Sequence, residues 1–464
     1  MDRHPPKPAS RPEKVSLWRY LRLFRKDILS AQPEKLYRAW MAEFRTPFFR
    51  SYLVNDTDLV DLVLRGRPDD FPKSDRIGAG LQPLLGRSVF LTNGEEWKRQ
   101  RRIIDPAFEG GRLRDTFPGI LAAADAGVAR LKGANGTPQE IEAIASHMAA
   151  DVIFRTLFSI PIEDATAQEV FHAFRAHQRT QPILNLAAFI RGPSWMPRFF
   201  RSETKRTAAH IRRLITKLTD DRLALIGAGR APDDLATKIM TTVDPQTGRT
   251  FTAEEMVDQV AIFFLAGHET SASALSWALY LLALYPEWQD KVAQEAADFD
   301  GTFAALSRLK VTRDVFRETL RLYPPVPMMV RETARPETFR KRLVARGSQI
   351  VLSPWHLHRH TRFWDEPDAF DPARWETEGG KATARSAYLP FSAGPRVCTG
   401  AGFAMIEGVV LLSRLVRDYR FAVLAARQPI PVAHLTVRAS DGIWLTISRK
   451  TDSCSQNRNS PQKA

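Results

Sequence analysis

The stretch Phe391-Ser-Ala-Gly394-Pro-Arg396-Val-Cys398-Thr-Gly400 carries the most information about this chain. Gly394 can adopt a positive φ and so permits a tight turn before the cysteine. Arg396 brings a fixed positive charge close to the sulfur. The residues after Cys398 read as a helix, and a thiol at a helix N-terminus meets unpaired amides and the positive end of the helix dipole, which lower its pKa. We therefore predict a thiolate that can bind iron from one side; a buried core cysteine is the alternative.

Five residues at fixed offsets decide between these interpretations. The segment resembles the Phe-x-x-Gly-x-Arg-x-Cys-x-Gly haem-binding loop of the cytochrome P450 family. In that family the cysteine is the axial ligand of the iron of haem, iron protoporphyrin IX. The resemblance therefore implies that Cys398 binds the cofactor and its metal. It also implies a cytochrome P450 fold, mainly α with a small β lobe, with haem between a long central helix and the helix after the cysteine loop.

The apolar stretch of residues 253–285 predicts that central helix. Thr252 with Glu255 three residues later forms a capping box, and Pro286 ends the helix. The stretch is long enough to span a bilayer, but its centre, residues 267–271, contains ionisable groups that are unfavourable at bilayer depth. We predict no membrane span and a helix buried inside the protein.

The sequence Ala266-Gly267-His268-Glu269-Thr270 lies within this helix. Glycine in a helix interior costs about 1 kcal/mol against alanine, so a flat cofactor pressing on the helix, or a local widening that admits water, would explain Gly267. Taken alone, such a polar patch is more often a packing feature. The segment resembles the oxygen-binding Ala-Gly-x-Glu/Asp-Thr motif of the same family. This resemblance implies that Thr270 and Glu269 are the catalytic pair that supplies protons.

Two further motifs contain arginine. Glu318 and Arg321 are three residues apart on a predicted helix, so their side chains share a face and can pair; a surface ion pair is the alternative. With Arg374 they resemble the family's Glu-x-x-Arg and Pro-x-Arg segments. These segments form a structural Glu–Arg–Arg network behind the cysteine loop.

Haem carries two propionates, so the chain should offer hydrogen-bond donors for them. Trp97 and Arg101, at i and i+4, place an indole N–H and a guanidinium on one helical face. They match the family's Trp-x-x-x-Arg helix. Arg396 is a third predicted cofactor-binding residue, and Arg331 is a fourth.

The segment Trp355-His356-Leu-His358-Arg-His360 alternates as a strand would and suggests a metal site. Zinc sites usually need four ligands with carboxylate or cysteine support. The segment also matches the family's His-Arg-Asp stretch, with His360 in place of the acid, and we favour this second interpretation.

The composition limits the function classes. Of 464 residues, 44% are hydrophobic and 26% are charged, as in an ordinary globular protein. The two cysteines, Cys398 and Cys454, exclude a disulfide framework and fit a reducing cytoplasm. The net charge of +15 is spread along the chain, without zinc-finger spacing or a basic tail. We therefore expect no nucleic-acid partner, and instead an acidic protein partner or an anionic membrane surface.

Composition and periodicity also predict the domain organisation. Residues 1–14 and 451–464 are expected to be disordered tails, and the start lacks the apolar core of a signal peptide. Residues 15–450 are expected to form a single cytochrome P450 domain. Helical periodicity dominates, and the strand-like runs are few: Phe49–Val54, Ser348–Ser353, Thr436–Arg438 and Ile443–Ile447.

A basic amphipathic helix is predicted close to the N-terminus. Its apolar face contains Leu17, Tyr20, Leu21, Phe24 and Ile28, and its opposite face Arg19, Arg22 and Lys26. Such a helix can lie on a membrane surface or dock on the body of the protein. The sequence leaves both interpretations open.

The motifs occur in family order over residues 40–450 and imply a haem-thiolate monooxygenase. The implied reaction is hydroxylation, in which one oxygen atom of dioxygen enters a lipophilic substrate and the other leaves as water. The sequence contains no flavin or iron–sulfur module, so NAD(P)H-derived electrons are expected from a separate ferredoxin or flavodoxin with its reductase. The alternatives are a peroxide-using or isomerising haem-thiolate enzyme and a non-catalytic haem sensor. We expect a cytoplasmic monomer, with peripheral membrane contact left open.

Mainly apolar segments are expected to line the substrate pocket, which favours a sizeable lipophilic substrate. They are Gly78–Leu91, Ile183–Trp195, Val260–Thr270, Val326–Val330 and Leu435–Val437. The central helix and the residues around Leu435 look most like those of the lipid- and carotenoid-hydroxylating branches.

Overall fold

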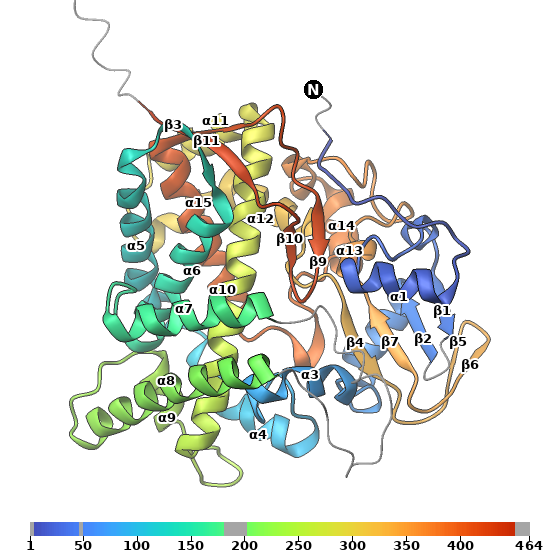
Figure 1. The fold of residues 1–464 in the computed structure, drawn as a ribbon, viewed down its shortest axis with the longest axis horizontal. Helices are drawn as coiled ribbons and strands as arrows, with labels where there is room; N and C mark the ends of the chain where they lie inside the picture. The colour runs from blue at the N-terminus through green and yellow to red at the C-terminus, as the bar shows by residue number, and fades with distance from the viewer. Residues whose placement is uncertain (1–3, 46–49, 181–201, 451–464) are drawn as a thin grey trace, which may run out of the picture.

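The computed structural model describes residues 4–45, 50–180 and 202–450. A large helical body is joined on one side by a smaller, strand-rich part (Figure 1). Helix α10, Ala253–Leu284, crosses the helical body from one end to the other (Figure 1). The predicted mainly α fold with a minor β part is confirmed.

Helix α10 begins and ends where the sequence predicts. The Thr252 hydroxyl accepts a hydrogen bond from the Glu255 amide at 3.2 Å, and the Glu255 carboxylate accepts one from the Thr252 amide at 2.9 Å, which completes the capping box. Pro286 ends the helix and starts α11, Pro286–Ala297. The 32 residues of α10 span about 48 Å. Residues 273–284 are all buried, as expected for a helix surrounded by protein on every side.

The other α-helices surround α10 or cover the strand-rich part. They are α1 Leu17–Lys26, α2 Thr57–Asp61, α3 Asp75–Leu85, α4 Gly94–Ile104, α5 Arg112–Arg130, α6 Ile141–Phe158, α7 Ala165–Thr180, α8 Ser202–Gly227, α9 Leu235–Thr241, α12 Lys310–Leu322, α13 Pro354–Leu357, α14 Glu378–Ala387 and α15 Ala401–Asp418. Within the described residues, no helix is both long and apolar enough to cross a membrane.

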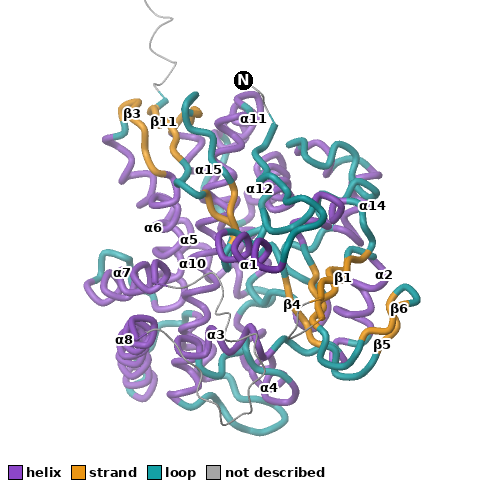
Figure 2. Tube along the Cα trace, turned by 45° about the vertical axis from the view of Figure 1, so that its right-hand side comes forward, coloured by secondary structure: helices purple, strands orange, loops and turns teal. Residues whose placement is uncertain are grey.

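Within the described residues, the strands form four small sheets rather than one lobe. Figure 2 shows one group beside α1 and another at the far end of the helical body. The largest sheet has the order β1-β2-β7-β4, in which only the β2–β7 pair is parallel. The remaining sheets are β3-β11-β8, β10-β9 and β5-β6. The bounds are β1 Met41–Arg45, β2 Arg50–Val54, β3 Asn135–Glu140, β4 Met329–Glu332, β5 Glu337–Phe339, β6 Arg342–Val344, β7 Gln349–Leu352, β8 Tyr419–Val423, β9 Pro431–Ala433, β10 Val437–Ala439 and β11 Trp444–Arg449.

Among the residues that the structure describes, buried apolar side chains form two hydrophobic clusters. The larger cluster joins α5, α6, α10, α12 and α15, and the smaller one lies under the β1-β2-β7-β4 sheet. At roughly 25 cal/mol per Å² of apolar surface buried, these clusters are the main stabilising contribution to the fold. They fix α10 and α15 relative to each other, and these two helices flank the site described below.

The N-terminal segment is more ordered than its composition predicts. Within residues 4–14, Pro5 and Pro6 are buried, and the Pro6 carbonyl accepts a hydrogen bond from the Tyr323 hydroxyl at 2.9 Å. Lys7 pairs with Asp368 at 2.8 Å. The prediction of a disordered tail is therefore wrong for residues 4–14, because specific partners far along the chain hold them. Residues 1–3 and 451–464 lie outside the described residues.

Helix α1 docks on the body of the protein. Tyr20, Leu21 and Phe24 face the large cavity described below. The helix ends at Lys26, so Ile28 lies just beyond it, although its side chain lines the same cavity. The apolar face is thus turned inward, while Trp18 on the outer side is 85% exposed.

Candidate active site

The cysteine loop lies between the strand-rich part and α15. Gly394 has a φ of 69°, and a Cβ atom there would lie 2.0 Å from the Leu64 carbonyl oxygen. Glycine is therefore required both by backbone conformation and by a close backbone approach. The Cys398 amide donates to the Phe391 carbonyl at 2.9 Å, and the Cys398 carbonyl accepts from the Ala401 amide at 3.2 Å in the first turn of α15. The predicted loop before a helix is confirmed.

The predicted lowering of the Cys398 pKa is wrong for the protein without a metal. Burial raises the pKa of this thiol above its ordinary value, although the Gly400 amide and Arg101 act in the opposite direction. The exposed surface of Cys398 faces an internal cavity. Desolvation therefore exceeds the effect of the helix end. A metal ion that coordinates the sulfur would itself displace the proton.

A cavity of about 1430 Å³ has Cys398 in its wall. Usual small-molecule sites measure roughly 300–1,000 Å³, so this cavity has room for a large cofactor together with a substrate. Four of the five segments predicted to line it contribute side chains, although only Leu435 does so from Leu435–Val437. The fifth, residues 183–195, lies outside the described residues. The sequence did not predict the contributions of α1 and of the end of α7.

The catalytic pair predicted on α10 faces this cavity. Thr270 Oγ1 donates to the Ala266 carbonyl at 2.5 Å. The Glu269 carboxylate is 8% exposed and accepts hydrogen bonds from Arg438 at 2.6 Å and Thr436 at 2.7 Å. Gln178 donates to its other oxygen at 3.2 Å. These three partners, from α7 and from the β9–β10 hairpin, were not predicted, because no local pattern connects them to Glu269.

Gly267 is explained by helix packing. A Cβ atom at this position would lie 2.3 Å from Ile153 Cδ1 of α6. Helix α6 packs along α10, and His268 next to Gly267 shares a 2.7 Å hydrogen bond with Ser146 of α6. The glycine therefore permits the two helices to approach closely, which neither of the two sequence-based explanations included.

Cationic side chains gather around Trp97 on α4, which is 6% exposed. Arg396 Cζ lies 4.9 Å, Lys73 Nζ 5.6 Å and Arg101 Cζ 5.9 Å from the centroid of the Trp97 ring. Arg331 of β4 is 7% exposed and lines the same cavity. The structure thus brings together all four predicted cofactor-binding donors and adds Lys73, which no motif in the sequence marks.

Arg101 and Arg396 connect this cluster to the surrounding backbone. Arg101 Nη1 donates to the Val397 carbonyl at 2.9 Å and Arg101 Nε to Asp105 at 2.7 Å. Arg396 Nη1 donates to the Pro68 carbonyl at 2.6 Å. Its buried Nε has no hydrogen-bond partner among the described residues. An orphaned guanidinium N–H in a cationic cavity wall fits an anionic group such as a propionate.

Behind the cysteine loop, the three predicted charged residues form one buried network. Arg321 donates to the Glu318 carboxylate from Nε at 2.9 Å and from Nη2 at 2.8 Å. Arg374 Nε donates to the same carboxylate at 2.9 Å. Arg321 also donates to the carbonyls of residues 358, 367 and 369. Glu318 and Arg321 are 0% exposed, so this is not the surface ion pair that was the alternative.

The histidine-rich segment is a short helix, α13, followed by turns, and not the strand that its alternation suggests. His356 bonds to Ser353 at 2.8 Å, and His358 accepts from the Leu389 amide at 2.8 Å. Within residues 4–45, 50–180 and 202–450, no three His, Cys, Asp or Glu side chains gather as a metal site. The histidines therefore join α13 to its surroundings.

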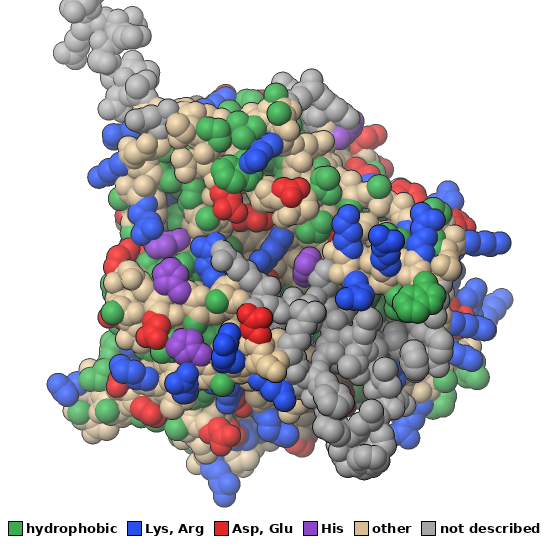
Figure 3. Space-filling view, in the orientation of Figure 1, with side chains coloured by type: hydrophobic (Ala, Val, Ile, Leu, Met, Phe, Trp, Pro, Cys, Tyr) green, Lys and Arg blue, Asp and Glu red, His purple; other side chains and the backbone are tan. Residues whose placement is uncertain are grey.

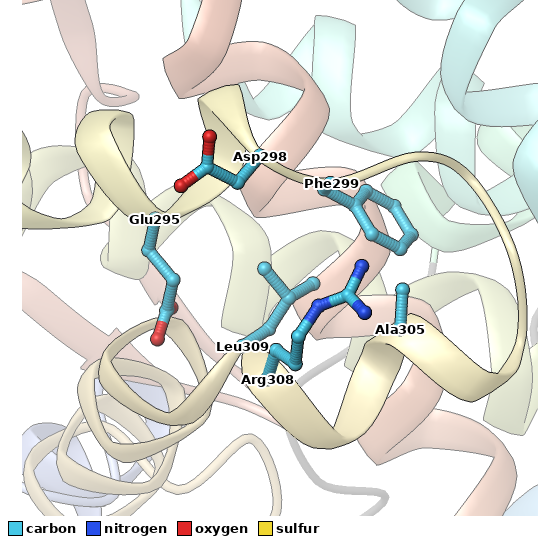
Figure 4. Close-up of a pocket in the computed structure, with 6 residues that line it drawn as sticks. All are labelled: Glu295, Asp298, Phe299, Ala305, Arg308 and Leu309. Atoms are coloured by element: carbon cyan, nitrogen blue, oxygen red, sulfur yellow. The ribbon is translucent and has the colours of Figure 1, made fainter.

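A second, small cavity of about 130 Å³ lies between the end of α11 and residues 298–309, which precede α12 (Figure 4). Two of its polar side chains, Glu295 and Arg308, already have partners. Glu295 accepts from the Thr312 amide at 2.8 Å, and Arg308 pairs with Asp300 at 2.9 Å. Its wall shares no residue with the large cavity, and we assign it a packing role.

One cavity is lined by the cysteine loop, by residues 265–271 of the long buried helix and by a cationic wall. The donor set fits haem, with a sulfur for the metal and guanidinium groups for the propionates. The chain belongs to the cytochrome P450 family, whose pattern its residues 29–446 match.

Curated relatives agree with this assignment. Cyclooctat-9-en-7-ol 5-monooxygenase of Streptomyces melanosporofaciens is 30% identical over 400 residues, covering 84% of this chain and 83% of that protein. Cytokinin hydroxylase of Arabidopsis thaliana is 28% identical over 403 residues, covering 85% and 78%. Cytochrome P450 4A11 of Homo sapiens is 30% identical over 426 residues, covering 86% and 80%. The chain is accordingly a monooxygenase that uses haem, dioxygen and electrons from a reductant.

The fold agrees with solved structures as well. The haem domain of cytochrome P450DA matches with a TM-score of 0.80 at 22% identity, covering 96% of this chain and 98% of that one. A mutant of the same haem domain matches with a TM-score of 0.78. At this identity the likeness shows the fold, and it confirms the predicted cytochrome P450 architecture.

Proposed function

We propose that this chain hydroxylates a lipophilic substrate at a haem whose iron is bound by Cys398, with Thr270 and Glu269 supplying protons. The observation that carries the proposal is that one cavity is lined both by the cysteine loop and by residues 265–271 of α10. When bound, haem supplies the activation of dioxygen and its insertion into a C–H bond. The chain supplies the sulfur ligand, the proton donors and the shape of the cavity.

Cys398 is positioned by the backbone on both sides. The hydrogen bond from its amide to the Phe391 carbonyl at 2.9 Å fixes the loop, and the Gly400 amide donates to the sulfur. An amide donor stabilises the thiolate relative to the thiol. In this proposal Trp97, Arg101, Arg331 and Arg396 bind the propionates, because all four line the same wall of the cavity.

Protons are proposed to reach the cavity through the Glu269 carboxylate and the Thr270 hydroxyl. Arg438, Thr436 and Gln178 hold the Glu269 carboxylate in place, so that it does not turn freely. The Thr270 hydroxyl donates to the Ala266 carbonyl and can exchange this bond for one to a guest in the cavity. In the proposed relay the oxygen accepts a proton from the acid side as the original hydroxyl hydrogen passes to the guest, so that the hydroxyl is left neutral.

The proposed lipophilic substrate follows from the cavity wall. Leu81, Phe90, Phe263, Val326 and Leu435 are among the apolar side chains that line it. Burial of apolar area contributes about 25 cal/mol per Å², so a large apolar molecule binds here more favourably than a small charged one. A screen of fatty acids, terpenoids and carotenoids by the spin-state shift of the ferric haem tests this. Shifts caused only by small, charged, water-soluble compounds would contradict it.

We further propose that electrons come from a separate ferredoxin or flavodoxin with its reductase. The net charge of +15 favours an acidic electron donor of this kind. Reconstitution with such a partner should give product that depends on NAD(P)H. Turnover that needs only peroxide would instead support the peroxide-using alternative.

Peripheral contact with an anionic membrane is also proposed, through the outer side of α1. Figure 3 shows Lys and Arg side chains along this helix. Arg19, Arg22, Arg25 and Lys26 are exposed beside the 85% exposed Trp18, a combination suited to acidic headgroups. Co-sedimentation with vesicles containing phosphatidylserine should decrease on Trp18→Ser, whereas equal sedimentation of both proteins would refute this contact.

Substitutions of Cys398 and of Thr270, each with a control variant, test the chemistry. The ferrous CO adduct of the wild type should show the red-shifted Soret band of thiolate ligation; Cys398→Ser should lose it and Cys454→Ser should keep it. A CO spectrum like that of a histidine-ligated haem would overturn the assignment.

Thr270→Ala should divert electrons to peroxide and lower the amount of product formed per NAD(P)H consumed, while Thr270→Ser should retain coupling. If Thr270→Ala left coupling unchanged, Thr270 would not be part of the proton route.

A further inference from the structure

The cationic wall of the cavity holds more positive charge than its own acids balance. Arg101 is paired with Asp105, and Arg396 has only the exposed Asp69 at 3.7 Å. Arg331 donates to the neighbouring Val330 carbonyl at 3.2 Å, and among the described residues the Lys73 amine donates to a carbonyl and not to a carboxylate. A wall of this kind is incomplete without an anionic guest.

Lys73 is held in this wall by specific contacts. The Lys73 amide donates to Asn93 Oδ1 at 3.0 Å, and Asn93 Nδ2 donates back to the Lys73 carbonyl at 3.1 Å. The backbone of Lys73 forms an isolated antiparallel bridge with Arg331. Its Nζ donates to the Val89 carbonyl at 2.6 Å. Because both the backbone and the amine have defined partners, Lys73 is a built part of the cavity and not a surface lysine that swings inward.

The surroundings of Lys73 disfavour its ammonium form. Burial lowers the pKa of Lys73 to about 6, helped by the positive charges of Arg396, Arg331 and Arg101. These arginines face it from the cysteine loop, from β4 and from α4, and every charge that acts on it is positive. Arginine keeps its proton in such a place, whereas lysine readily gives its proton up. At pH 7 or above, Lys73 of the haem-free protein is therefore mostly a neutral amine.

We propose that Lys73 takes up a proton when haem propionates enter this wall, so that haem uptake by the protein is coupled to protonation of Lys73. The inference rests on the proposed function only in taking haem as the guest and this wall as its propionate site. Carboxylates next to an amine favour its charged form. The proton moves from solvent to Lys73 Nζ, and the new ammonium ion then balances propionate charge that the arginines leave uncompensated.

Cys398 complicates a direct measurement, because its thiol loses a proton when the sulfur coordinates the metal. The two protons move in opposite directions and partly cancel in the wild type. Comparison of variants at position 73 removes this difficulty, since the contribution of Cys398 is the same in each. Lys73→Arg keeps a cation that does not titrate, and Lys73→Met has no charge at all.

The test is titration of the haem-free protein with ferric haem by calorimetry, in buffers of different ionisation enthalpy at pH 7.5. The wild type should take up about one proton more per haem than either Lys73→Arg or Lys73→Met. The ratio of wild-type to Lys73→Arg haem affinity should fall roughly tenfold per pH unit between about pH 6.5 and 8.5. An equal proton count in wild type and Lys73→Arg would overturn the proposal.

Haem dimethyl ester, which lacks free carboxylates, provides the matched control. With this ester the wild type and Lys73→Arg should bind the same number of protons. A difference that persisted with the ester would show that the propionates do not drive the protonation, and would refute the coupling. The proposed function is judged separately, since its failure would appear in the CO spectrum and not in the proton count.

Discussion

Replacing Gly267 by alanine tests why the central helix has a glycine in its interior. Alanine is favoured over glycine in a helix by about 1 kcal/mol. The new Cβ atom would lie 2.3 Å from Cδ1 and 3.0 Å from Cγ1 of Ile153, and such overpacking costs about 1–3 kcal/mol. Gly267→Ala should therefore change the free energy of unfolding by about 0–2 kcal/mol in the destabilising direction.

The sign of this effect should reverse when Ile153 is truncated. Ile153→Ala alone is expected to destabilise the protein by about 2–5 kcal/mol, and it removes both atoms that the new Cβ would meet. In that background Gly267→Ala should stabilise by about 1 kcal/mol, the helix-propensity gain alone. Urea unfolding of the four proteins, with and without haem, measures the cycle.

Two outcomes would refute this explanation. If Gly267→Ala had the same effect in the wild-type and in the Ile153→Ala backgrounds, contact with α6 would not be the reason for the glycine. If the substitution instead weakened haem binding equally in both backgrounds, the glycine would be needed to make room for the cofactor, as the sequence alone suggested.

Three further predictions concern buried ionisable groups and their partners. Glu318→Ala should destabilise by about 3–5 kcal/mol in urea, because it leaves two buried arginines uncompensated; Glu378→Ala at an exposed pair should change stability by less than about 1 kcal/mol. Stability should fall as pH decreases from about 6.5 to 3, by up to about 4 kcal/mol per pH unit. The reason is that burial lowers the pKa of His268, His356 and His358 to about 3, so the unfolded chain binds more protons; a flat urea midpoint over this range would contradict it. Arg438→Met removes the cation that binds the Glu269 carboxylate and should therefore lower the amount of product formed per NAD(P)H consumed. If this amount did not change, Glu269 would not need the positive charge of Arg438.

The local features of this protein could be predicted from the residues themselves, whereas long-range contacts could be predicted only where the family resemblance supplied them, as for the contact between Glu318 and Arg374. The capping box at Thr252, the turn at Gly394 and the helix after Cys398 each depend on residues a few positions apart, where periodicity and turn chemistry apply. The contacts of Glu269 with Arg438 and of Arg101 with Val397 join residues 169 and 296 positions apart. No local pattern encodes such pairs, so they became visible only with the fold.

The same limit explains the error over Cys398 and the omission of Lys73. Sequence shows that the thiol precedes a helix, which lowers its pKa, but not how much solvent the fold removes. In the structure desolvation exceeds the helix effect and raises the pKa. Lys73 is likewise an ordinary lysine in sequence, and only its burial among three arginines makes it titrate near neutral pH. The pKa of a group depends on all the atoms that surround it in the fold, whereas a sequence motif contains only its neighbours in the chain.

Under the proposed function, the β9–β10 hairpin connects substrate contact with proton supply. Leu435 lines the cavity, while Thr436 and Arg438 bind the Glu269 carboxylate at 2.7 and 2.6 Å. The Val437 carbonyl between them accepts from Ser273 of α10 at 2.5 Å. Because these residues are consecutive, a guest that displaces Leu435 also shifts the groups that orient the acid. If the proposed roles hold, the shape of the substrate and the delivery of protons are not independent, since one short turn of backbone supports both.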